Sequence, residues 1–286
     1  MTETEKYIEF NNVTFSYGTQ GDETESRKRK DAVKDVSFAI EKGTFVCIIG
    51  SNGSGKSTVA KLMNGLILPT SGTVISAGYD TSDDQNIWEI RRLVGMVFQN
   101  PDNQIIATSV EEDVAFGLEN IGVPREEMIA RVDEALKMCG VDKYRHSEPH
   151  LLSGGQKQRV SIAGILAMRP SCIVLDESTA MLDPKGRKQV LDIVKKLNKE
   201  ENITVILITH HMDEIVDADR VLVMEKGELV KAGTPVEIFS DRELISDLGL
   251  DLPPAARVFE PEDGHDFGET VLTKEQGVSV LMKKLV

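Results

Sequence analysis

The sequence predicts an α/β fold built on a buried, largely parallel β-sheet, and two observations carry this prediction. Three short and mainly apolar runs, at 44–49, 172–176 and 203–209, are typical of strands that are covered on both faces. A glycine-rich segment, GSNGSGKS at 50–57, connects the first run to a helical pattern at about 56–65. A strand, a glycine-rich loop and a helix in this order indicate a phosphate-binding unit.

Length, charge and cysteine content narrow the class of protein. The 286 residues suffice for one large domain with an appendage, and a hydrophobic content of 40% is ordinary for a globular chain. The net charge of −14 argues against nucleic acid as a partner. Three widely spaced cysteines without a CxxC pattern indicate reduced thiols in a cytosolic protein, and Cys47 and Cys172, which lie in apolar runs, are expected to be buried. No apolar run reaches the roughly 20 residues of a membrane span, so a membrane role would require a partner.

The N-terminal part reads as strands interrupted by one polar loop. Residues 7–17 contain two short alternating runs that predict strands, and further strands are expected at 35–40 and 72–76. The segment 18–31 is charged and without periodicity. Its basic run, 27–30, is flanked by acidic residues, which favours an exposed loop over a nucleic-acid patch.

The middle of the chain changes to helical signals after the apolar run GMVF. Ser109 and Glu112 have the spacing of a capping box, Pro124 is placed to open a helix, and Gly140 is placed to close it. Residues 99–168 are therefore expected to be mainly helical.

The C-terminal third begins with a helix at about 184–199, between two of the buried strands. Beyond it, 219–286 is expected to form a smaller region with strands in RVLVME and ELVKA. A helix opens at TPVE, 234–237, and a late capping box occurs at TKEQ, 273–276.

The segment 50–57 fits the pattern GxxxxGK[ST] in the context that this pattern requires. Backbone N–H groups of such a loop surround phosphate oxygens, Lys56 reaches the β and γ phosphates, and Ser57 ligates Mg²⁺. A chance match is the alternative, at about one per cent for this composition. The residues expected to bind nucleotide here are Gly50, Ser51, Asn52, Gly53, Ser54, Gly55, Lys56, Ser57 and Thr58.

Two acids follow the buried run CIVL. Asp176 stands where a strand ends, as a carboxylate ligand of the phosphate-loop magnesium does, and is the predicted metal residue. Glu177, one position later, is the candidate base for the attacking water. The alternative is a pair of acids that only terminates a strand.

The segment LSGGQ at 152–156 separates this chain from kinases, GTPases and motor ATPases. Ser153 is placed as a helix N-cap with Gln156 in the capping-box position, while Gly154 and Gly155 leave the backbone bare. This predicts a second anion site. One chain has no need of two sites for one γ phosphate, but two chains arranged head to tail would each supply one to the other.

Together these motifs resemble the nucleotide-binding subunits of ABC ATPases over about 7–235. The resemblance implies that Tyr17 stacks on adenine, Gln99 contacts Mg²⁺ and the attacking water, and His210 contacts the γ phosphate. It also implies that 180–183 faces a dimer partner. A strand-end aromatic and a structural histidine are the alternatives for Tyr17 and His210.

The implied architecture is a P-loop NTPase of the ABC ATPase type, with a RecA-like core, an antiparallel β subdomain and a helical subdomain at about 99–168. The nucleotide-binding domain would occupy 1–240. A small α+β extension, 241–286, would serve dimerisation.

The segments FQNPDNQI, SVEEDVAFGLEN, LGLDLPP and VLTKEQ resemble, more narrowly, the ATPases of energy-coupling-factor (ECF) transporters. Such transporters contain two similar ATPases. Ser178 stands where many ABC ATPases have proline, and in this respect the chain resembles the first of the two ATPases. The resemblance implies ATP and Mg²⁺ as cofactors and a peripheral position on the cytoplasmic side of the cell membrane. It implies three partners: a second homologous ATPase in a head-to-tail heterodimer, a transmembrane coupling subunit, and a membrane protein that binds a vitamin or metal ion.

Three other functions remain possible on the sequence. A subunit of a conventional ABC transporter would use the same catalytic residues with other partners. An ATPase of DNA repair would need long heptad segments, which are lacking, and an inactive structural member would lack Glu177 or His210.

Overall fold

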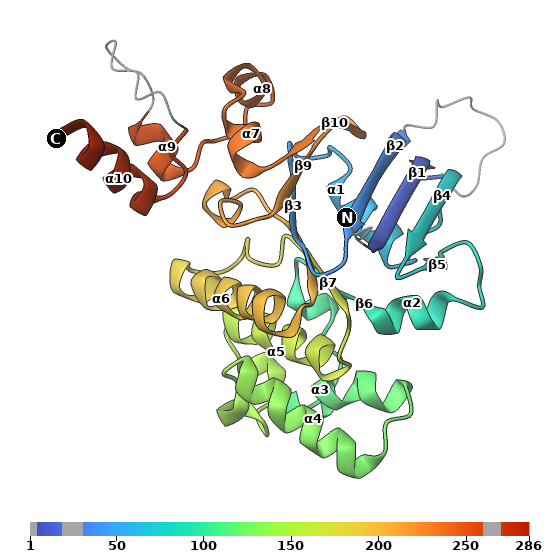
Figure 1. Ribbon diagram of the computed structural model, residues 1–286. Coiled ribbons are helices and arrows are strands. Elements are labelled where there is room, and N and C mark those ends of the chain that lie inside the picture. The colour runs from blue at the N-terminus through green and yellow to red at the C-terminus, as the bar shows by residue number, and fades with distance from the viewer. Residues whose placement is uncertain (1–4, 19–30, 260–269, 286) are drawn as a thin grey trace.

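The computed structural model describes residues 5–18, 31–259 and 270–285, and the basic run at 27–30 lies outside these ranges. The larger sheet lies in the middle of the molecule, between the smaller sheet on one side and the C-terminal helices on the other (Figure 1). The strands are β1 (Lys6–Ser16), β2 (Asp31–Glu41), β3 (Phe45–Gly50), β4 (Ser71–Ser76), β5 (Tyr79–Asp80), β6 (Val94–Val97), β7 (Cys172–Asp176), β8 (Thr204–Ile208), β9 (Arg220–Glu225) and β10 (Glu228–Gly233).

The larger sheet has the order β10-β9-β3-β8-β7-β6, and all its pairings are parallel except that of β10 with β9. Side chains of β3 alternate between two cores. Val46 and Ile48 pack with β1, β2 and α1 (Lys56–Met63), whereas Cys47 and Ile49 pack toward the helical side. Burial on both faces explains why these strands are continuously apolar.

The parallel strands bring four loops to one edge of the sheet. Because the carboxyl ends of parallel strands lie together, the segments after β3, β6, β7 and β8 meet there. These segments carry 50–57, Gln99, Glu177 and His210. The topology therefore predicts the position of a site before any side chain is considered.

The smaller sheet has the order β2-β1-β4-β5 and is antiparallel in all its pairings. The sequence predicts two strands within 7–17, but β1 is a single strand whose register with β2 shifts between Phe10 and Val13. The polar pair Asn11-Asn12 lies at this irregularity, and Asn12 has a positive φ of 48°. A bulge was thus mistaken for a break between strands.

The helical subdomain contains α3 (Val110–Asn120), α4 (Arg125–Met138) and α5 (Gly154–Ala167), and α5 packs against both others. The predicted capping box is confirmed, since Ser109 and Glu112 bond each other's backbone. Pro124 precedes α4, and Gly140 follows it with a positive φ of 62°. The helix α2 (Ile87–Leu93) was not predicted, because only Ile90 of it is buried and no apolar stripe marks it.

The C-terminal region requires a correction. The strands expected in a smaller region at 219–286, β9 and β10, belong to the large sheet, because β9 pairs in parallel with β3 through Val46 to Gly50. The described residues after Gly233 form helices alone. These are α7 (Pro235–Phe239), α8 (Arg242–Asp247), α9 (Pro254–Val258) and α10 (Lys274–Leu285).

All three cysteine thiols are buried, which confirms the prediction for Cys47 and Cys172 and adds Cys139. Burial raises the pKa of Cys139 to about 12 and raises the pKa of Cys47 and Cys172 as well. At pH 8 the reactive thiolate is therefore scarce, and the thiols are also out of reach of reagents.

We expect iodoacetamide to label none of the three cysteines in the folded protein and all three in guanidinium chloride, as measured by mass spectrometry. Rapid labelling of the folded chain would contradict this packing.

Among the described residues, no helix combines the length and the apolar character that crossing a membrane would require.

Candidate nucleotide-binding and hydrolysis site

The phosphate loop follows β3, and its shape depends on glycine. Gly50 has a φ of 148°, and a Cβ there would lie 2.0 Å from the carbonyl oxygen of Met224. Gly55 has a φ of 101°, and a Cβ there would lie 2.3 Å from the carbonyl oxygen of Ala32. Any side chain at either position would push the loop away from the neighbouring backbone.

Helix α1 starts at the end of this loop with an uncapped N-terminus. Gly55 is its N-cap and supplies no side-chain bond, and the first turn contains no acid. The free N–H groups and the positive end of the helix dipole therefore face the loop, as an anion site requires. A cavity of about 300 Å³ lies here, lined by Tyr17, Ala32, residues 52–58 and Glu177.

Lys56 is buried beneath the loop, with 4% of its side chain exposed. Its ammonium donates to the carbonyl oxygens of Gly50 and Ser51, both at 3.0 Å. Burial lowers the pKa of Lys56, while the carboxylates of Glu177 and Asp176 counteract this shift. Lys56 also lines the phosphate-loop cavity, where the sequence predicts a phosphate contact.

Ser57 and Asp176 meet although 119 residues separate them. The Ser57 hydroxyl donates to Asp176 Oδ1 at 2.9 Å. Asp176 ends the buried strand β7 and is 6% exposed. Burial raises the pKa of this carboxyl, whereas the Ser57 hydrogen bond lowers it. A cation at this position would relieve the cost of the buried charge.

Glu177 lies at the centre of the predicted catalytic residues. Its Oε1 is 2.7 Å from Nε2 of His210 and 4.0 Å from the Lys56 ammonium. Its Oε2 accepts a hydrogen bond of 2.9 Å from the amide of Gln99. The structure thus brings together all four residues that the sequence predicted for hydrolysis.

The backbone of Glu177 is turned out of the strand. Its φ is 48°, a left-handed value that is uncommon for a residue other than glycine, and its N–H donates to the carbonyl oxygen of Ile208 at 3.1 Å. Because β7 ends at Asp176, a turn and not a continuing strand directs the side chain of Glu177.

Tyr17 lies at the rim of the phosphate-loop cavity, half exposed. Its hydroxyl lies 3.2 Å from the hydroxyl of Thr58, and its ring packs edge-on against Phe15 with centroids 4.8 Å apart. The open face of the ring is available to a planar ligand.

The LSGGQ segment opens α5, and its predicted capping box is confirmed. Gln156 Oε1 accepts from the Ser153 N–H at 2.8 Å, and Ser153 caps Gln156 N in return. A Cβ on Gly154 would meet nothing within 4 Å, so the backbone is open to a ligand. Among the described residues, 153–156 do not line the phosphate-loop cavity.

Two side chains that support this segment were not predicted. Tyr144 accepts a hydrogen bond of 2.6 Å from the Gln156 amide, and Lys157 pairs with Asp102 at 2.6 Å. Neither contact follows a local spacing rule, so the sequence alone contained no signal for them.

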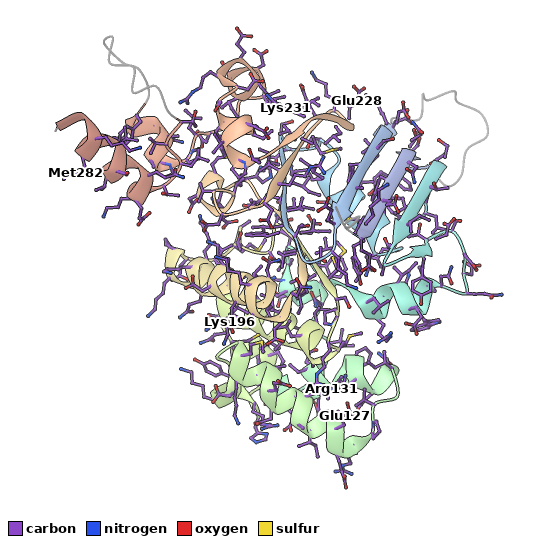
Figure 2. The ribbon with its side chains drawn as sticks, viewed as in Figure 1. Glu127, Arg131, Lys196, Glu228, Lys231 and Met282 are labelled. Carbon is purple, nitrogen blue, oxygen red and sulfur yellow. The ribbon has the colours of Figure 1, made fainter. Side chains whose placement is uncertain are left out.

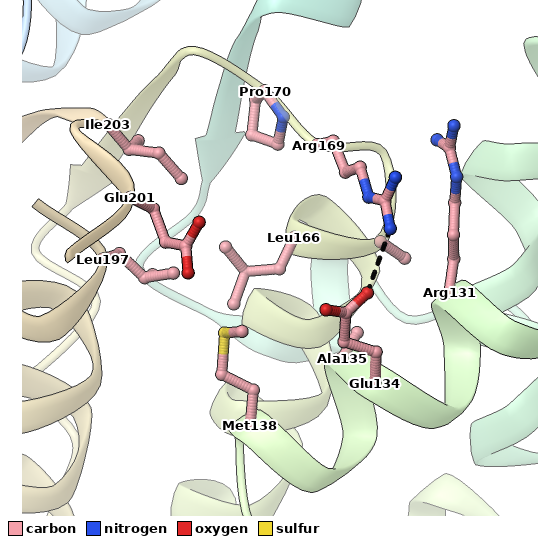
Figure 3. A pocket seen from close by; sticks show the side chains of 11 residues that line it. Arg131, Glu134, Ala135, Met138, Leu166, Arg169, Pro170, Leu197, Glu201 and Ile203 are labelled. Carbon is pink, nitrogen blue, oxygen red and sulfur yellow. Dashed lines mark hydrogen bonds and ion pairs between the residues drawn. The ribbon is translucent and has the colours of Figure 1, made fainter.

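A separate cavity of about 230 Å³ lies where α4 and α5 face α6 (Pro184–Glu201), as Figure 3 shows. An ion pair between Arg169 and Glu134 borders it, with Met138, Leu166 and Leu197 among its apolar lining. It contains none of the predicted site residues.

Comparison with known proteins agrees with this geometry. Residues 33–180 match the ABC transporter family. The energy-coupling factor transporter ATP-binding protein EcfA1 of Clostridium novyi (strain NT) is 53% identical over 279 residues, which cover 97% of this chain and 98% of the relative. The energy-coupling factor transporter ATP-binding protein EcfA of Enterococcus faecium is 51% identical over 279 residues, which cover 97% of each chain.

Two solved structures are similar in fold. The cbiO1 protein of Clostridium perfringens, described as part of the ABC transporter complex cbiONQ, aligns with a TM-score of 0.73 at 35% identity, covering 90% of this chain and 100% of that one. A dimer of the ATP-binding cassette MJ0796 in a post-hydrolysis state, bound to ADP and Pi, aligns with a TM-score of 0.72 at 33% identity. That alignment covers 80% of this chain and 98% of the other.

Proposed function

We propose a detailed function from one premise: the chain belongs to the ABC transporter family, among the ATP-binding proteins of energy-coupling factor transporters, and is an ATPase that powers transport. This membership leaves open which residues act on ATP, which partners the chain has, and what kind of solute is moved.

The observation that carries the catalytic assignment is the meeting of Lys56, Gln99, Glu177 and His210 at the end of the phosphate loop. We assign Lys56 to the β and γ phosphates, where its charge stabilises the transferred group. Glu177 and Gln99 hold the attacking water, and His210 contacts the γ phosphate while its ring also orients Glu177. Tyr17 stacks on adenine.

The residues around Asp176 fit a magnesium ion. Mg²⁺ prefers oxygen ligands and is usually bound by one or two protein groups together with phosphate oxygens. The Ser57 hydroxyl, the Asp176 carboxylate and the side-chain oxygen of Gln99 supply such a set. When bound, the ion would neutralise charge on the β and γ phosphates.

A head-to-tail dimer completes each site. The bare helix end at Gly154 and Gly155 is separated from the cavity of its own chain, so it can serve the nucleotide of a partner. Met181, in the segment 180–183, is largely exposed, as a partner-facing residue would be. The dimeric state of MJ0796 supports this arrangement. We propose a second, homologous ATPase as the partner.

A membrane subunit would bind the face formed by α2 and α3. A cavity of about 260 Å³ lies there, and three large apolar side chains on it are exposed: Trp88 by 70%, Ile106 by 63% and Phe116 by 44%. Apolar groups gathered in this way on an otherwise charged surface mark an interaction site. We propose that a helix of the transmembrane coupling subunit occupies it.

The segment 99–104 connects this face to both nucleotide motifs. Asp102 pairs with Lys157 on the LSGGQ helix, and Gln104 accepts from the Phe98 N–H at 3.2 Å and donates to the Ser161 carbonyl at 3.4 Å. Movement of the helical subdomain would therefore be transmitted to Gln99.

We expect Asp102→Asn and Gln104→Leu to lower transport severalfold in reconstituted complexes, because both variants loosen the link between the subdomain and Gln99. ATP affinity should stay within about twofold, since neither side chain lines the phosphate-loop cavity. The matched control is Asp192→Asn, since Asp192 is an exposed carboxylate on α6 that pairs with Lys188. Equal losses of transport and nucleotide affinity would contradict this division of roles.

The C-terminal extension, 241–286, is proposed to stabilise the dimer. Its helix α10 lies at the edge of the molecule, where Figure 2 labels Met282. Val278, Leu281 and Met282 on this helix are exposed. Val280 and Val271 face inward instead. Apolar residues on the outer face of a terminal helix suit contact with the same region of a partner.

Within the complete assembly this chain would lie on the cytoplasmic side of the cell membrane, and a further membrane subunit would bind a vitamin or a metal ion for uptake. Affinity purification of this chain from detergent-extracted membranes tests the proposal. A second ATPase, a coupling protein and a small membrane protein should purify with it. Recovery as a homodimer with two permease subunits would identify a conventional ABC transporter instead.

A further inference from the structure

Glu214 is fully buried, with none of its surface exposed, and the proposed reaction does not use it. It ends the short helix Met212–Glu214, which follows His210. One carboxylate oxygen, Oε2, accepts hydrogen bonds from two hydroxyl groups: from Thr209 at 2.5 Å and from Thr179 at 3.1 Å. Burying a carboxylate costs free energy, which the two hydroxyl donors offset.

The two threonines flank the residues assigned to catalysis. Thr209 immediately precedes His210, and Thr179 lies two positions after Glu177. Both threonines are 1% exposed. Glu214 thus joins the segment that carries the histidine to the segment that carries the candidate base.

The same two segments are also bonded through the backbone, since the Glu177 N–H donates to the Ile208 carbonyl at 3.1 Å. This bond lies before Glu177 and His210 reach the site, and the bonds of Glu214 lie beside them. The Thr209 hydroxyl also accepts the His211 N–H at 3.0 Å while it donates to Glu214. The hydroxyl of Thr209 therefore holds the peptide N–H that directly follows His210, while Glu214 holds the hydroxyl.

The opposite oxygen of Glu214 faces helix α6. Its Oε1 lies 3.8 Å from Nε of Arg187, and within the described ranges neither atom has a hydrogen-bond partner. Arg187 in turn donates its backbone N–H to the carbonyl of Asp183, at the end of the segment 180–183. The carboxylate therefore lies between the catalytic pair and the segment proposed to face the dimer partner.

We propose that Glu214 is a positioning residue for ATP hydrolysis: by binding the hydroxyls of Thr179 and Thr209 it holds Glu177 and His210 at the separation that the reaction requires. The proposal rests on the proposed roles of Glu177 and His210. Displacement of a catalytic group by about 1 Å costs roughly 10²-fold in rate, so loss of this support affects turnover far more than binding.

The test uses pairs of variants that differ in the hydroxyl or the carboxylate alone. Thr179→Val and Thr209→Val remove one hydroxyl each at nearly constant shape, whereas Thr179→Ser and Thr209→Ser retain it. Glu214→Leu removes both acceptors, and Glu214→Gln keeps one oxygen for the hydroxyls. Each variant is assembled with its membrane partners, and kcat, KM and the Kd of a fluorescent ATP analogue are measured.

We expect kcat to fall roughly tenfold or more in both valine variants and in Glu214→Leu. The serine variants and Glu214→Gln should stay within about threefold of the wild type, and KM and Kd should change by less than twofold throughout. If Glu214→Leu fails to fold, the comparison of the valine with the serine variants, together with Glu214→Gln, still tests the proposal. Wild-type kcat in both valine variants, or parallel losses of kcat and nucleotide affinity, would overturn the proposal.

A Glu177→Gln variant in the same assay separates this inference from the proposed function. If it abolishes turnover while the valine variants keep the wild-type rate, only the role of Glu214 is wrong. If Glu177→Gln itself turns over normally, the catalytic assignment is wrong and the positioning role is overturned with it.

Discussion

Replacing Glu177 by glutamine should lower the rate of ATP hydrolysis by roughly 10²- to 10⁴-fold, the usual contribution of a general base. The amide cannot accept a proton from water. It can still accept a hydrogen bond from Gln99 or His210, which now contact the two carboxylate oxygens at 2.9 and 2.7 Å. The fold and the nucleotide cavity should therefore persist.

The same variant should retain ATP affinity, because Glu177 carries a negative charge, which repels phosphate and so contributes nothing to nucleotide binding. Phosphate release and binding of a fluorescent ATP analogue, measured on the assembled complex, separate the two effects. Glu228→Gln is the matched control, since Glu228 is exposed on β10 and lies 3.6 Å from Lys34. Turnover at the wild-type rate would remove Glu177 from the reaction.

Replacing Lys56 by alanine should produce the second large effect, on binding itself. A hydrogen bond to a charged group contributes about 1.5–3 kcal/mol, which corresponds to a loss of roughly 10- to 150-fold in ATP affinity. The ammonium of Lys56 lies under the loop on the carbonyl oxygens of Gly50 and Ser51, from which it can reach phosphate.

Isothermal titration of ATP into Lys56→Ala and into Lys196→Ala measures this loss. Lys196 is an exposed residue of α6 whose ammonium lies 3.6 Å from Glu200 (Figure 2), so its removal should leave affinity unchanged. Unaltered ATP affinity in Lys56→Ala would show that the backbone of the loop binds the phosphates without the lysine.

Much of this site could be predicted from the sequence because its chemistry lies in short contiguous motifs. The segment 50–57 encodes both the loop conformation and its ligands, and the run before Asp176 shows where a buried strand ends. The convergence of Gln99, Glu177 and His210 followed from strand order, since the carboxyl ends of parallel strands share one edge.

The remainder could not be predicted because it depends on pairing between distant segments. The strands β9 and β10 have the same local pattern whether they form a separate sheet or extend the large one, and only the pairing of β9 with β3 decides. Glu214 resembles any other acid in the run HHMDE. Its importance becomes visible only when Thr179, 35 residues earlier, packs beside it.

Reconstitution tests the central claim most directly, that ATP hydrolysis at this site drives solute uptake through membrane partners. The complex that purifies with the chain is placed in liposomes, and uptake of radiolabelled vitamins and metal ions is measured with ATP on the face that carries the chain. The account predicts uptake of one such solute that requires ATP and is lost in Glu177→Gln. Equal uptake by the Glu177→Gln complex, or hydrolysis that moves none of these solutes, would contradict it.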